Sequence, residues 1–498
     1  MNTHMTINHT TPESRGVSSS RIEEYLRHLE SHHLAMHDIL IARGNDILAE
    51  IYYPPFTAGK PHRLYSVTKS FVALAVGFAF QDGLLSLDDP MSKYFARELE
   101  AGGQNDGEYG LHMQTVRNML MMSTAKSTQD WFTARHLDRV QFYFSKTNPA
   151  RKPGEKFEYD SSGTFILGAL VERLTGKTLM DYLGEKMFSK IGISDHPRAL
   201  FCPGGHTWGD SAFLMSPTDL YRAARFVLNG GTWDGEQILS ADYVREATSC
   251  LIPTGDGTHV DGNGYGYYIW KAYGEGFFFN GMGCQFALCV PEKDLIFVCN
   301  ADNQGNPDAK NIILDGFYDI IVKNTADTFP KDPAAEESLA AYVSTLKLFS
   351  AYGDTTSTLA ETVGGRTYAL GENRMGIRWI RLDFNGDTGV FRYENAQGEK
   401  ELLFGMCRNA FADFPQRGYS DLVGSEPGER LYHGAYSGAW RDEKTFWLKV
   451  QLIDDYFGNM DAVFTFAENG ESMELVMTKT AEDFLREYEG RAQGIPVK

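Results

Sequence analysis

The spacing of hydrophobic and polar positions changes several times along the chain and divides it into regions. Residues 20–29 combine a capping-box sequence with apolar residues at helical spacing, which predicts a helix. Residues 38–42 and 47–53 fit a pair of strands joined by a Gly-Asn-Asp turn. From residue 67 to about residue 249 the pattern is mostly helical and is interrupted by glycine and proline loops.

Strand-like segments return after this helical region. They are residues 266–270, 277–279, 285–291 and 295–300, and a helix is predicted over 308–322. The early and late strands therefore bracket a large helical insertion. We expect them to form one antiparallel sheet with helices on its faces and a mostly helical lobe beside it, an α/β architecture.

The pattern changes again near residue 328. Residues 329–338 contain proline and charged side chains and are interpreted as a linker between a first domain, 1–328, and a second domain, 339–498. One helix is predicted over 339–349, followed by short alternating segments. These are 379–384, 390–393, 402–406, 445–453, 462–466 and 473–477, separated by Asn-Gly turns. Such a pattern predicts an all-β domain, a barrel or a sandwich.

Composition narrows the class of protein. The 498 residues carry a formal net charge of −19, which argues against a nucleic-acid partner because phosphate binding needs clustered Lys and Arg. The strongly apolar stretch 71–80 is half the length of a membrane span, so we interpret it as a buried helix. Residues 1–14 are polar and show no secretory signal. Six cysteines without a C-x-x-C motif indicate buried thiols and a reducing cytoplasm.

The sequence Ser66-Val67-Thr68-Lys69 is a candidate for nucleophilic catalysis. At the start of a helix, Ser66 and Lys69 would share one face and lie within reach of each other. A serine hydroxyl needs a neighbouring base to become a nucleophile, and burial beside residues 71–80 would favour a neutral lysine. The N–H groups of a helix start also stabilise developing negative charge.

Taken alone, S-x-x-K is a weak signal. The chain has two further matches, beginning at Ser123 and at Ser344, so at least two of the three arise by chance. Only Ser66 lies between a strand-and-loop region and an apolar helix. Ser344 lies within a helical segment near the linker, and Ser123 ends a Met-rich run that is typical of core.

Five blocks in a fixed order give the motif its context. They are 63–70 (RLYSVTKS), 85–90 (LSLDDP), 115–120 (TVRNML), 153–163 (PGEKFEYDSSG) and 214–220 (LMSPTDL). In this order the chain resembles the serine β-lactamase and penicillin-binding-protein superfamily, in particular the class C β-lactamase-like esterases and D-aminopeptidases. The resemblance covers about residues 20–322.

The resemblance implies a catalytic role for three residues. Ser66 would be the nucleophile, and Tyr159 would hydrogen-bond to it and share the role of general base with Lys69. Without this context, Tyr159 would be interpreted as a packed tyrosine whose hydroxyl is satisfied. The reaction would proceed through an acyl-enzyme and needs no metal or organic cofactor.

The chain departs from the family pattern at two places. Ser161 stands where Asn is usual, and a hydroxyl has fewer donors than an amide. The third motif, Lys-Thr-Gly or His-Thr-Gly in the family, corresponds here to Phe279-Asn280-Gly281. We expect these residues to bind substrate, with Gly281 allowing its close approach and the Met282 N–H joining the Ser66 N–H in an oxyanion hole.

The Lys or His that begins the family's third motif is missing from this chain. A substrate carboxylate would therefore lose about 1.5–3 kcal/mol of charge-assisted hydrogen bonding, which favours a small neutral ester or amide as substrate. Two alternatives remain. A D-amino-acid peptidase or weak β-lactamase would need a cation from elsewhere, such as Lys126 or Arg135. A non-catalytic binding or scaffolding protein would also explain the altered motifs. A homo-oligomer is compatible with the sequence.

A loop region that includes Gln129, Trp131 and Phe132 could line the pocket. For the two aromatic residues, packing in the core is at least as good an interpretation. The histidine pairs His28/His32 and His33/His37 have helical spacing, but no H-E-x-x-H motif accompanies them, so exposed histidines are favoured over metal ligands.

Overall fold

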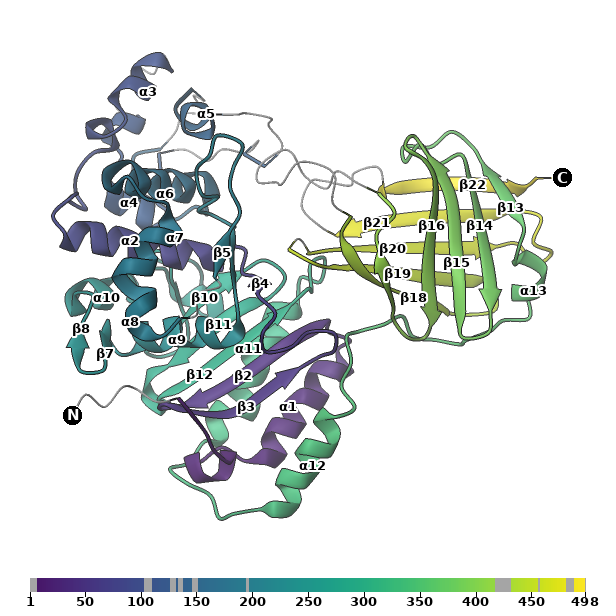
Figure 1. The fold of residues 1–498 in the computed structure, drawn as a ribbon, viewed down its shortest axis with the longest axis horizontal. Coiled ribbons are helices and arrows are strands. Elements are labelled where there is room, and N and C mark those ends of the chain that lie inside the picture. Colours follow the sequence, from purple (N-terminus) through teal and green to yellow (C-terminus); the bar gives the residue numbers. More distant parts are fainter. Residues whose placement is uncertain are drawn as a thin grey trace. The chain divides into compact units, whose positions relative to one another are not determined.

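The chain forms two compact units, the first ending at Lys347 and the second beginning at Leu348. The computed structural model describes residues 7–102, 110–125, 131–132, 138–145, 151–193, 197–416, 431–455, 457–480 and 488–497. Figure 1 shows a mixed unit of helices and one central sheet, and a second unit made almost entirely of strands. This is the predicted α/β fold with an all-β unit after it.

Within the described part of the first unit, the central sheet has seven strands. Their spatial order is β1 (Asn8–His9), β3 (Asp46–Tyr52), β2 (Met36–Arg43), β12 (Leu295–Ala301), β11 (Gln285–Val290), β10 (Phe277–Gly281) and β9 (Trp270–Lys271). The pairs from β3 to β9 are antiparallel, and only the short β1 runs parallel to its neighbour. Early and late segments therefore share one sheet, as the pattern predicts.

One face of the sheet is covered by two helices from opposite ends of the unit. Helices α1 (Ser19–Ser31) and α11 (Ala309–Ile320) pack there (Figure 1). Tyr25 of α1 illustrates the packing, since its ring contacts Phe297 of β12 and Phe317 of α11 edge-on. The spacing that predicts a helix over residues 20–29 thus produces an amphipathic helix with its apolar side on the sheet.

Other helices lie on the opposite face and form the helical lobe. Helix α9 (Pro217–Leu228) packs on β2, β11 and β12, and α2 (Val67–Gln81) packs on β10, α6 and α7. The remaining elements of the unit are short or lie further out. They are α3 (Ala96–Ala101), α4 (Val116–Leu120), α5 (Arg139–Ser145), α6 (Ser161–Thr175), α7 (Leu179–Leu183), α8 (Ser189–Ile191), α10 (Ala241–Ala247), β4 (His62–Arg63), β5 (Arg198–Ala199), β6 (Phe213–Met215), β7 (Thr232–Trp233) and β8 (Glu236–Gln237).

Helix α2 is buried on all sides, which is why its sequence is apolar at nearly every position. Val67 through Ala79 are all buried. A helix that is apolar around its whole circumference belongs in a core, so the stretch 71–80 is the buried helix that the sequence predicts. Because this helix is buried, its first turn is held in a fixed position.

The end of the first unit differs from the prediction. Helix α12 runs over Pro333–Val343 and so occupies much of the predicted linker 329–338, while the predicted helix 339–349 stops early. Pro333 is at the first helical position, where its missing N–H costs nothing, and Asp332 caps the Ala335 N–H at 3.0 Å. Helix α12 packs on α1 in the first unit, although none of its residues is buried.

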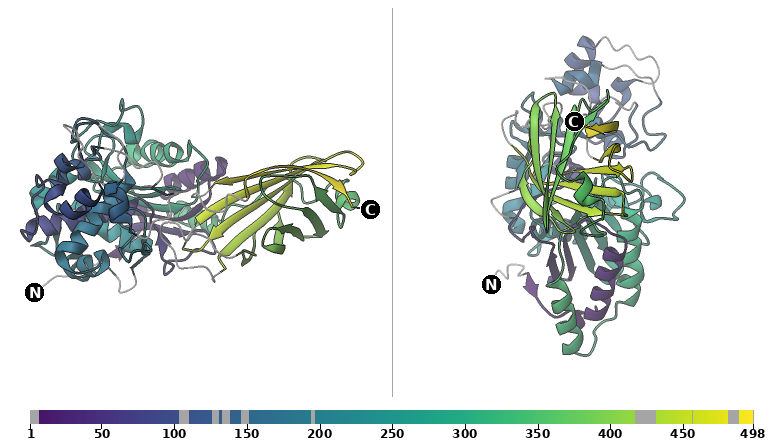
Figure 2. Two further views of the ribbon diagram at one scale, coloured as in Figure 1. Left: turned by 90° about the horizontal axis from the view of Figure 1, so that it is seen from above. Right: turned by 90° about the vertical axis from the view of Figure 1, so that its right-hand side faces the viewer.

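The second unit is a closed barrel. In the described residues its ring order is β16 (Gly398–Met406), β15 (Thr388–Asn395), β14 (Trp379–Asn385), β13 (Thr367–Leu370), β22 (Gly490–Pro496), β21 (Met473–Thr480), β20 (Phe457–Phe466), β19 (Thr445–Ile453) and β18 (His433–Trp440). A short parallel pairing of β16 with β18 closes the ring, and β17 (Ala410–Asp413) pairs outside it on β18. Helix α13 (Ala360–Val363) precedes the first strand. Figure 2 shows the strands wrapping around the barrel.

Aromatic side chains fill the barrel. Phe384, Phe404, Trp440 and Phe446 contact one another with ring centres 5.1–6.3 Å apart. These rings form the core of the barrel.

Two further sequence expectations concern cysteines and membranes. All six cysteines are free, four are buried, Cys407 is partly exposed and Cys250 is exposed. Among the helices that the structure describes, none combines the length and apolar character needed to cross a membrane.

Candidate active site

The backbone presents Ser66 at the start of α2 through an unusual turn. Tyr65, the preceding residue, has φ of +47°, a left-handed conformation that is strained for a bulky side chain. The turn is held because the Leu64 N–H donates to the Phe213 carbonyl at 2.8 Å and the Arg63 guanidinium lies 4.3 Å from the centre of the Tyr65 ring. Strain at this point is compensated by the buried surroundings.

Lys69 lies one helical turn after Ser66 and touches it. Its Nζ is 2.8 Å from Ser66 Oγ and also donates to the Asp210 carbonyl at 2.7 Å. The lysine is 2% exposed, so its amine is shielded from bulk water, whereas Ser66 is partly exposed. The S-x-x-K spacing therefore produces direct contact between the hydroxyl and the amine.

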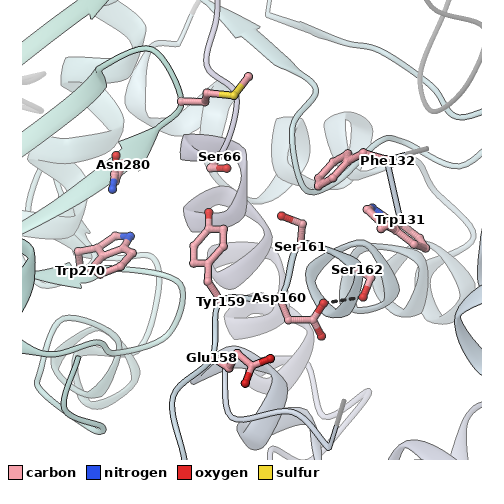
Figure 3. A pocket seen from close by; sticks show the side chains of 11 residues that line it. Ser66, Trp131, Phe132, Glu158, Tyr159, Asp160, Ser161, Ser162, Trp270 and Asn280 are labelled. Carbon is pink, nitrogen blue, oxygen red and sulfur yellow. Dashed lines mark hydrogen bonds between the residues drawn. The ribbon is translucent and has the colours of Figure 1, made fainter. Parts of the chain in front are cut away.

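Tyr159 reaches the same point from a distant segment, the loop before α6. Figure 3 shows its hydroxyl directed toward Ser66. Lys69 Nζ lies 5.1 Å from the centre of the Tyr159 ring, and the ring of Trp270 stacks beside it with centres 6.1 Å apart. The structure thus brings together the three residues to which the resemblance assigns catalysis.

Asp160 fixes the loop that carries Tyr159. Its carboxylate accepts a hydrogen bond from Ser162 Oγ at 2.5 Å (Figure 3) and another from Thr124 Oγ1 at 3.1 Å. Burial raises the pKa of Asp160, and the hydrogen bonds oppose that rise. Because Asp160 also precedes the first residue of α6, it ties the helix start to the neighbouring segment at Thr124.

The opposite wall comes from the turn between β10 and β11. Asn280 and Met282 line the cavity there. Phe279 is fully buried and packs against Phe71, so its predicted role in substrate binding is corrected. The reason is the two-residue alternation of a strand, which turns Phe279 and Gly281 away when Asn280 faces the cavity.

Gly281 serves a packing role. A Cβ at this position would lie 2.3 Å from the Leu64 carbonyl oxygen, which no side chain tolerates. Gly281 is therefore required for the close approach of β10 to the segment that leads into Ser66. The expected close approach occurs, but to the protein's own backbone.

Gln285 clamps the turn that follows. It is fully buried, and its Nε2 donates to the Met282 carbonyl at 2.7 Å and to the Ala301 carbonyl at 2.8 Å. Its Oε1 accepts from the Ala301 N–H at 3.1 Å. The residue that carries the predicted oxyanion-hole donor is thus tied to the next strand through its carbonyl by a satisfied amide.

The cavity between these walls has a volume of about 600 Å³. It is lined by Ser66, Trp131, Phe132, Glu158, Tyr159, Asp160, Ser161, Ser162, Trp270, Asn280 and Met282. Ser161 faces the cavity as expected. Phe132, Tyr159 and Met282 are each more than a third exposed, which marks an accessible apolar surface. None of the described lining residues is Lys or Arg.

Several residues of the loop region lie outside the described residues. They are Gln129, a predicted substrate contact, and the candidate cations Lys126 and Arg135. In the described residues no three His, Cys, Asp or Glu side chains are grouped to hold a metal ion.

Sequence reasoning missed Trp270 and Asp210 at this site. Trp270 ends a segment that reads as an ordinary strand, and its position opposite Tyr159 depends on sheet order. Asp210 belongs to no motif, and only its backbone carbonyl touches Lys69. No local signal in the sequence identifies either residue.

The comparison with protein families agrees with this geometry. A family model described as Beta-lactamase matches residues 26–315, more than half of the chain. The chain belongs to the Beta-lactamase family. Ser66, Lys69 and Tyr159 all lie inside the matched region.

Relatives within this family are distant. The 6-aminohexanoate-dimer hydrolase of Paenarthrobacter ureafaciens is 26% identical over 217 residues, which cover 41% of this chain and 55% of that protein. A β-lactamase of Yersinia enterocolitica is 27% identical over 143 residues, 28% of this chain and 34% of its own. The chain therefore spans about half the length of the first relative and a third of the second.

A solved structure shows the same fold. A proposed 6-aminohexanoate-dimer hydrolase from Bacillus anthracis superposes with a TM-score of 0.52 at 14% sequence identity. The superposition covers 63% of this chain and 85% of the other. At this identity the likeness supports the β-lactamase-like architecture and says nothing about substrate.

Proposed function

We propose that the protein is a serine hydrolase that cleaves an ester or amide bond of a small neutral substrate through an acyl-enzyme on Ser66. The observation that carries this proposal is the 2.8 Å contact between Lys69 Nζ and Ser66 Oγ beneath the Tyr159 ring. Activation of a serine hydroxyl needs a neighbouring base, and the amine and the phenol lie beside it here.

The reaction follows from this arrangement. Tyr159 and Lys69 take the proton of Ser66 as its Oγ attacks the substrate carbonyl carbon, and they return it to the leaving alcohol or amine. The N–H groups of Ser66 and Met282 stabilise the oxyanion. Water, activated by the same pair, then attacks the ester bond of the acyl-enzyme and releases the acid.

The lining of the cavity supports a neutral substrate. Phe279 stands where the family has a cation and is buried, and Asn280 faces the cavity beside it. The other described lining residues are aromatic, hydroxyl-bearing, acidic or methionine. A substrate carboxylate would meet Glu158 and Asp160 without a described cationic partner in the cavity wall, whereas an uncharged acyl chain can pack on Trp131, Phe132 and Trp270.

The name of one relative favours an amide among such substrates. The Paenarthrobacter protein is described as a 6-aminohexanoate-dimer hydrolase, and two aminohexanoate units are joined through an amide bond. An extended aliphatic amide would fit a cavity with aromatic walls. We therefore include linear amides beside simple esters among the substrates to be tested.

Covalent labelling tests the proposal. A fluorophosphonate probe should label the wild-type protein and leave Ser66→Ala unlabelled, because the probe reports an activated serine. Ser344→Ala is the matched control, since it removes the serine of another S-x-x-K sequence and should retain full labelling.

The outcomes separate the alternatives. Labelling by fluorophosphonate but not by labelled penicillin supports the esterase or amidase, and labelling by penicillin supports the peptidase or weak β-lactamase. A folded protein that reacts with neither probe contradicts a hydrolase and favours a binding protein. Rates with 4-nitrophenyl esters and linear amides would then narrow the acyl group.

A further inference from the structure

A second cavity lies on the other face of β9 and β10 from the catalytic cavity. In β9, Trp270 lines the catalytic cavity (Figure 3), and the next residue, Lys271, lines the second cavity. Lys271 pairs in register with Phe277 of β10, which lines the second cavity as well. Successive side chains of a strand point to opposite faces, so adjacent residues serve two separate cavities. The second cavity has a volume of about 480 Å³, which is in the range of small-molecule sites.

Much of the wall of this second cavity is apolar. Val227 of α9, Val244 of α10 and Phe277 of β10 line it, and all three are buried. Pro291, which follows β11, also lines it. An alkyl chain bound against these side chains would remove apolar surface from water on both partners.

Backbone hydrogen bonds hold two walls of the second cavity together. The Tyr267 N–H donates to the Ala247 carbonyl at 3.0 Å, and the Leu251 N–H donates to the Tyr265 carbonyl at 2.9 Å. These bonds fix the end of α10 to the segment that leads into β9. The cavity is therefore pre-formed, and binding does not require these walls to become ordered.

The charged residues of the second cavity are Arg245, Lys271 and Glu275. The side chain of Lys271 is 13% exposed, and its Nζ lies 3.8 Å from Glu275 Oε2, too far for a hydrogen bond. Glu275 is 81% exposed, and Arg245 forms an exposed ion pair with Asp242. In the described part of the chain Lys271 has no other ion pair, so its ammonium can donate to an anion. The described lining of the catalytic cavity, in contrast, has acidic side chains and neither Lys nor Arg.

We propose that the second cavity binds an aliphatic carboxylate. The carboxylate accepts hydrogen bonds from Lys271 and Arg245, and the alkyl chain lies along the apolar wall. An alkylammonium would be repelled by the two cations, and an alcohol would leave the ammonium of Lys271 without a charged partner. A dianion such as an alkyl phosphate would bring a second negative charge toward Glu275. Binding here does not depend on the chemistry at Ser66.

Protection of Cys250 from alkylation tests the proposal, because this exposed thiol lines the second cavity. The full-length protein is treated with iodoacetamide with and without octanoate, and each cysteine is followed by peptide mass spectrometry. Octanoate should slow alkylation of Cys250 about threefold or more at saturation, because the bound chain covers the thiol. Cys407, partly exposed in the second unit, is the internal control and should react at an unchanged rate.

Variants of the cations assign the binding to this cavity. Lys271→Met should raise the octanoate concentration that gives half protection about tenfold, because a charge-assisted hydrogen bond is lost, and Lys271→Arg should stay close to wild type. Arg245→Met should raise it by a smaller factor, and it serves if Lys271→Met does not fold. Lys323→Met removes an exposed lysine elsewhere in the first unit and should change nothing.

Three results would overturn the proposal. The first is a folded wild-type protein in which octanoate leaves the alkylation of Cys250 unchanged. The second is protection by 1-octanol, octylamine or octyl phosphate at concentrations as low as those of octanoate, which would show that the cavity does not select a carboxylate. The third is undiminished protection by octanoate in both Lys271→Met and Arg245→Met, which would place the ligand elsewhere.

Discussion

The two walls of the cavity are built differently. The wall formed by α2 and the loop before α6 carries ionisable groups, and Ser66, Lys69 and Tyr159 converge there. The wall formed by the β10–β11 turn is neutral, with Asn280 facing the cavity and Gln285 holding the backbone. Bond-making chemistry is thus concentrated on one side and recognition on the other, so each should respond separately to mutation.

The largest effect is expected on the ionisable wall. Tyr159→Phe keeps the ring against Trp270 but removes the proposed base, so kcat/KM should fall roughly 100- to 10,000-fold. Hydrolysis of 4-nitrophenyl acetate measures it. Tyr265→Phe, a buried neighbour of Trp270, is the control and should remain near wild type. A Tyr159→Phe enzyme within threefold of wild type would remove Tyr159 from the mechanism.

A smaller loss of activity is expected when the hydrogen bonds of Gln285 behind the neutral wall are removed. Gln285→Met leaves the Met282 carbonyl without its donor, so the proposed oxyanion hole should loosen and kcat should fall about tenfold or more with KM little changed. Unfolding should become easier by about 1–3 kcal/mol. Gln416→Met, at a buried amide of the barrel, should lower stability without changing kcat. Equal loss of kcat in both variants would argue against a role of Gln285 in the oxyanion hole.

Introducing a cation into the neutral wall should change selectivity rather than rate. Asn280→Lys should lower KM for carboxylate-bearing esters about tenfold and leave that for neutral esters nearly unchanged, because a charge-assisted hydrogen bond is gained. Asn280→Met, with a long uncharged side chain, is the comparison. If both variants shift both substrate classes alike, Asn280 does not set the charge preference.

The smallest effect on activity is expected for the sheet behind the neutral wall, where a buried carboxyl governs stability instead. Burial raises the pKa of Asp38 to about 8, against hydrogen bonds from Asn300. The folded protein then holds a proton that the unfolded chain releases, so stability should decline as pH rises from about 4 to about 8 and level off above. Asp38→Asn should flatten this part of the curve. Urea unfolding at pH 5 and pH 9 measures how much the free energy of unfolding changes with pH in each protein. The same change in wild type and in Asp38→Asn would show that Asp38 is ionised in the fold.

The sequence predicts the catalytic wall better than the recognition wall. Ser66 and Lys69 are three positions apart at the start of one helix, so local spacing alone places them together, and the order of five motif blocks adds Tyr159. The strand segments 277–279 and 285–291 are also predicted from the sequence. Which face of β10 meets the cavity depends on sheet packing, so Phe279 was assigned to the wrong side.

Residues that act through long-range contacts escape such reasoning. Asp210 reaches Lys69 only because Arg63 and Thr68 hold its segment against α2. The boundary between the units is another example, since the packing of α12 on α1, not composition, decides to which unit it belongs. In the barrel, the short β13 and β17 are four residues each and carry too little pattern to predict.

The pairing of β13 with β22 has a consequence for synthesis. The sheet of the first unit is complete once Ala301 has been made, but the barrel cannot close until residues 490–496 emerge, because they bridge β13 and β21. A ribosome-bound chain therefore carries a finished first unit beside a curled sheet with two open edges. Such edges recruit other strands, so late translation is the stage at which this protein is most exposed to aggregation and most in need of a chaperone.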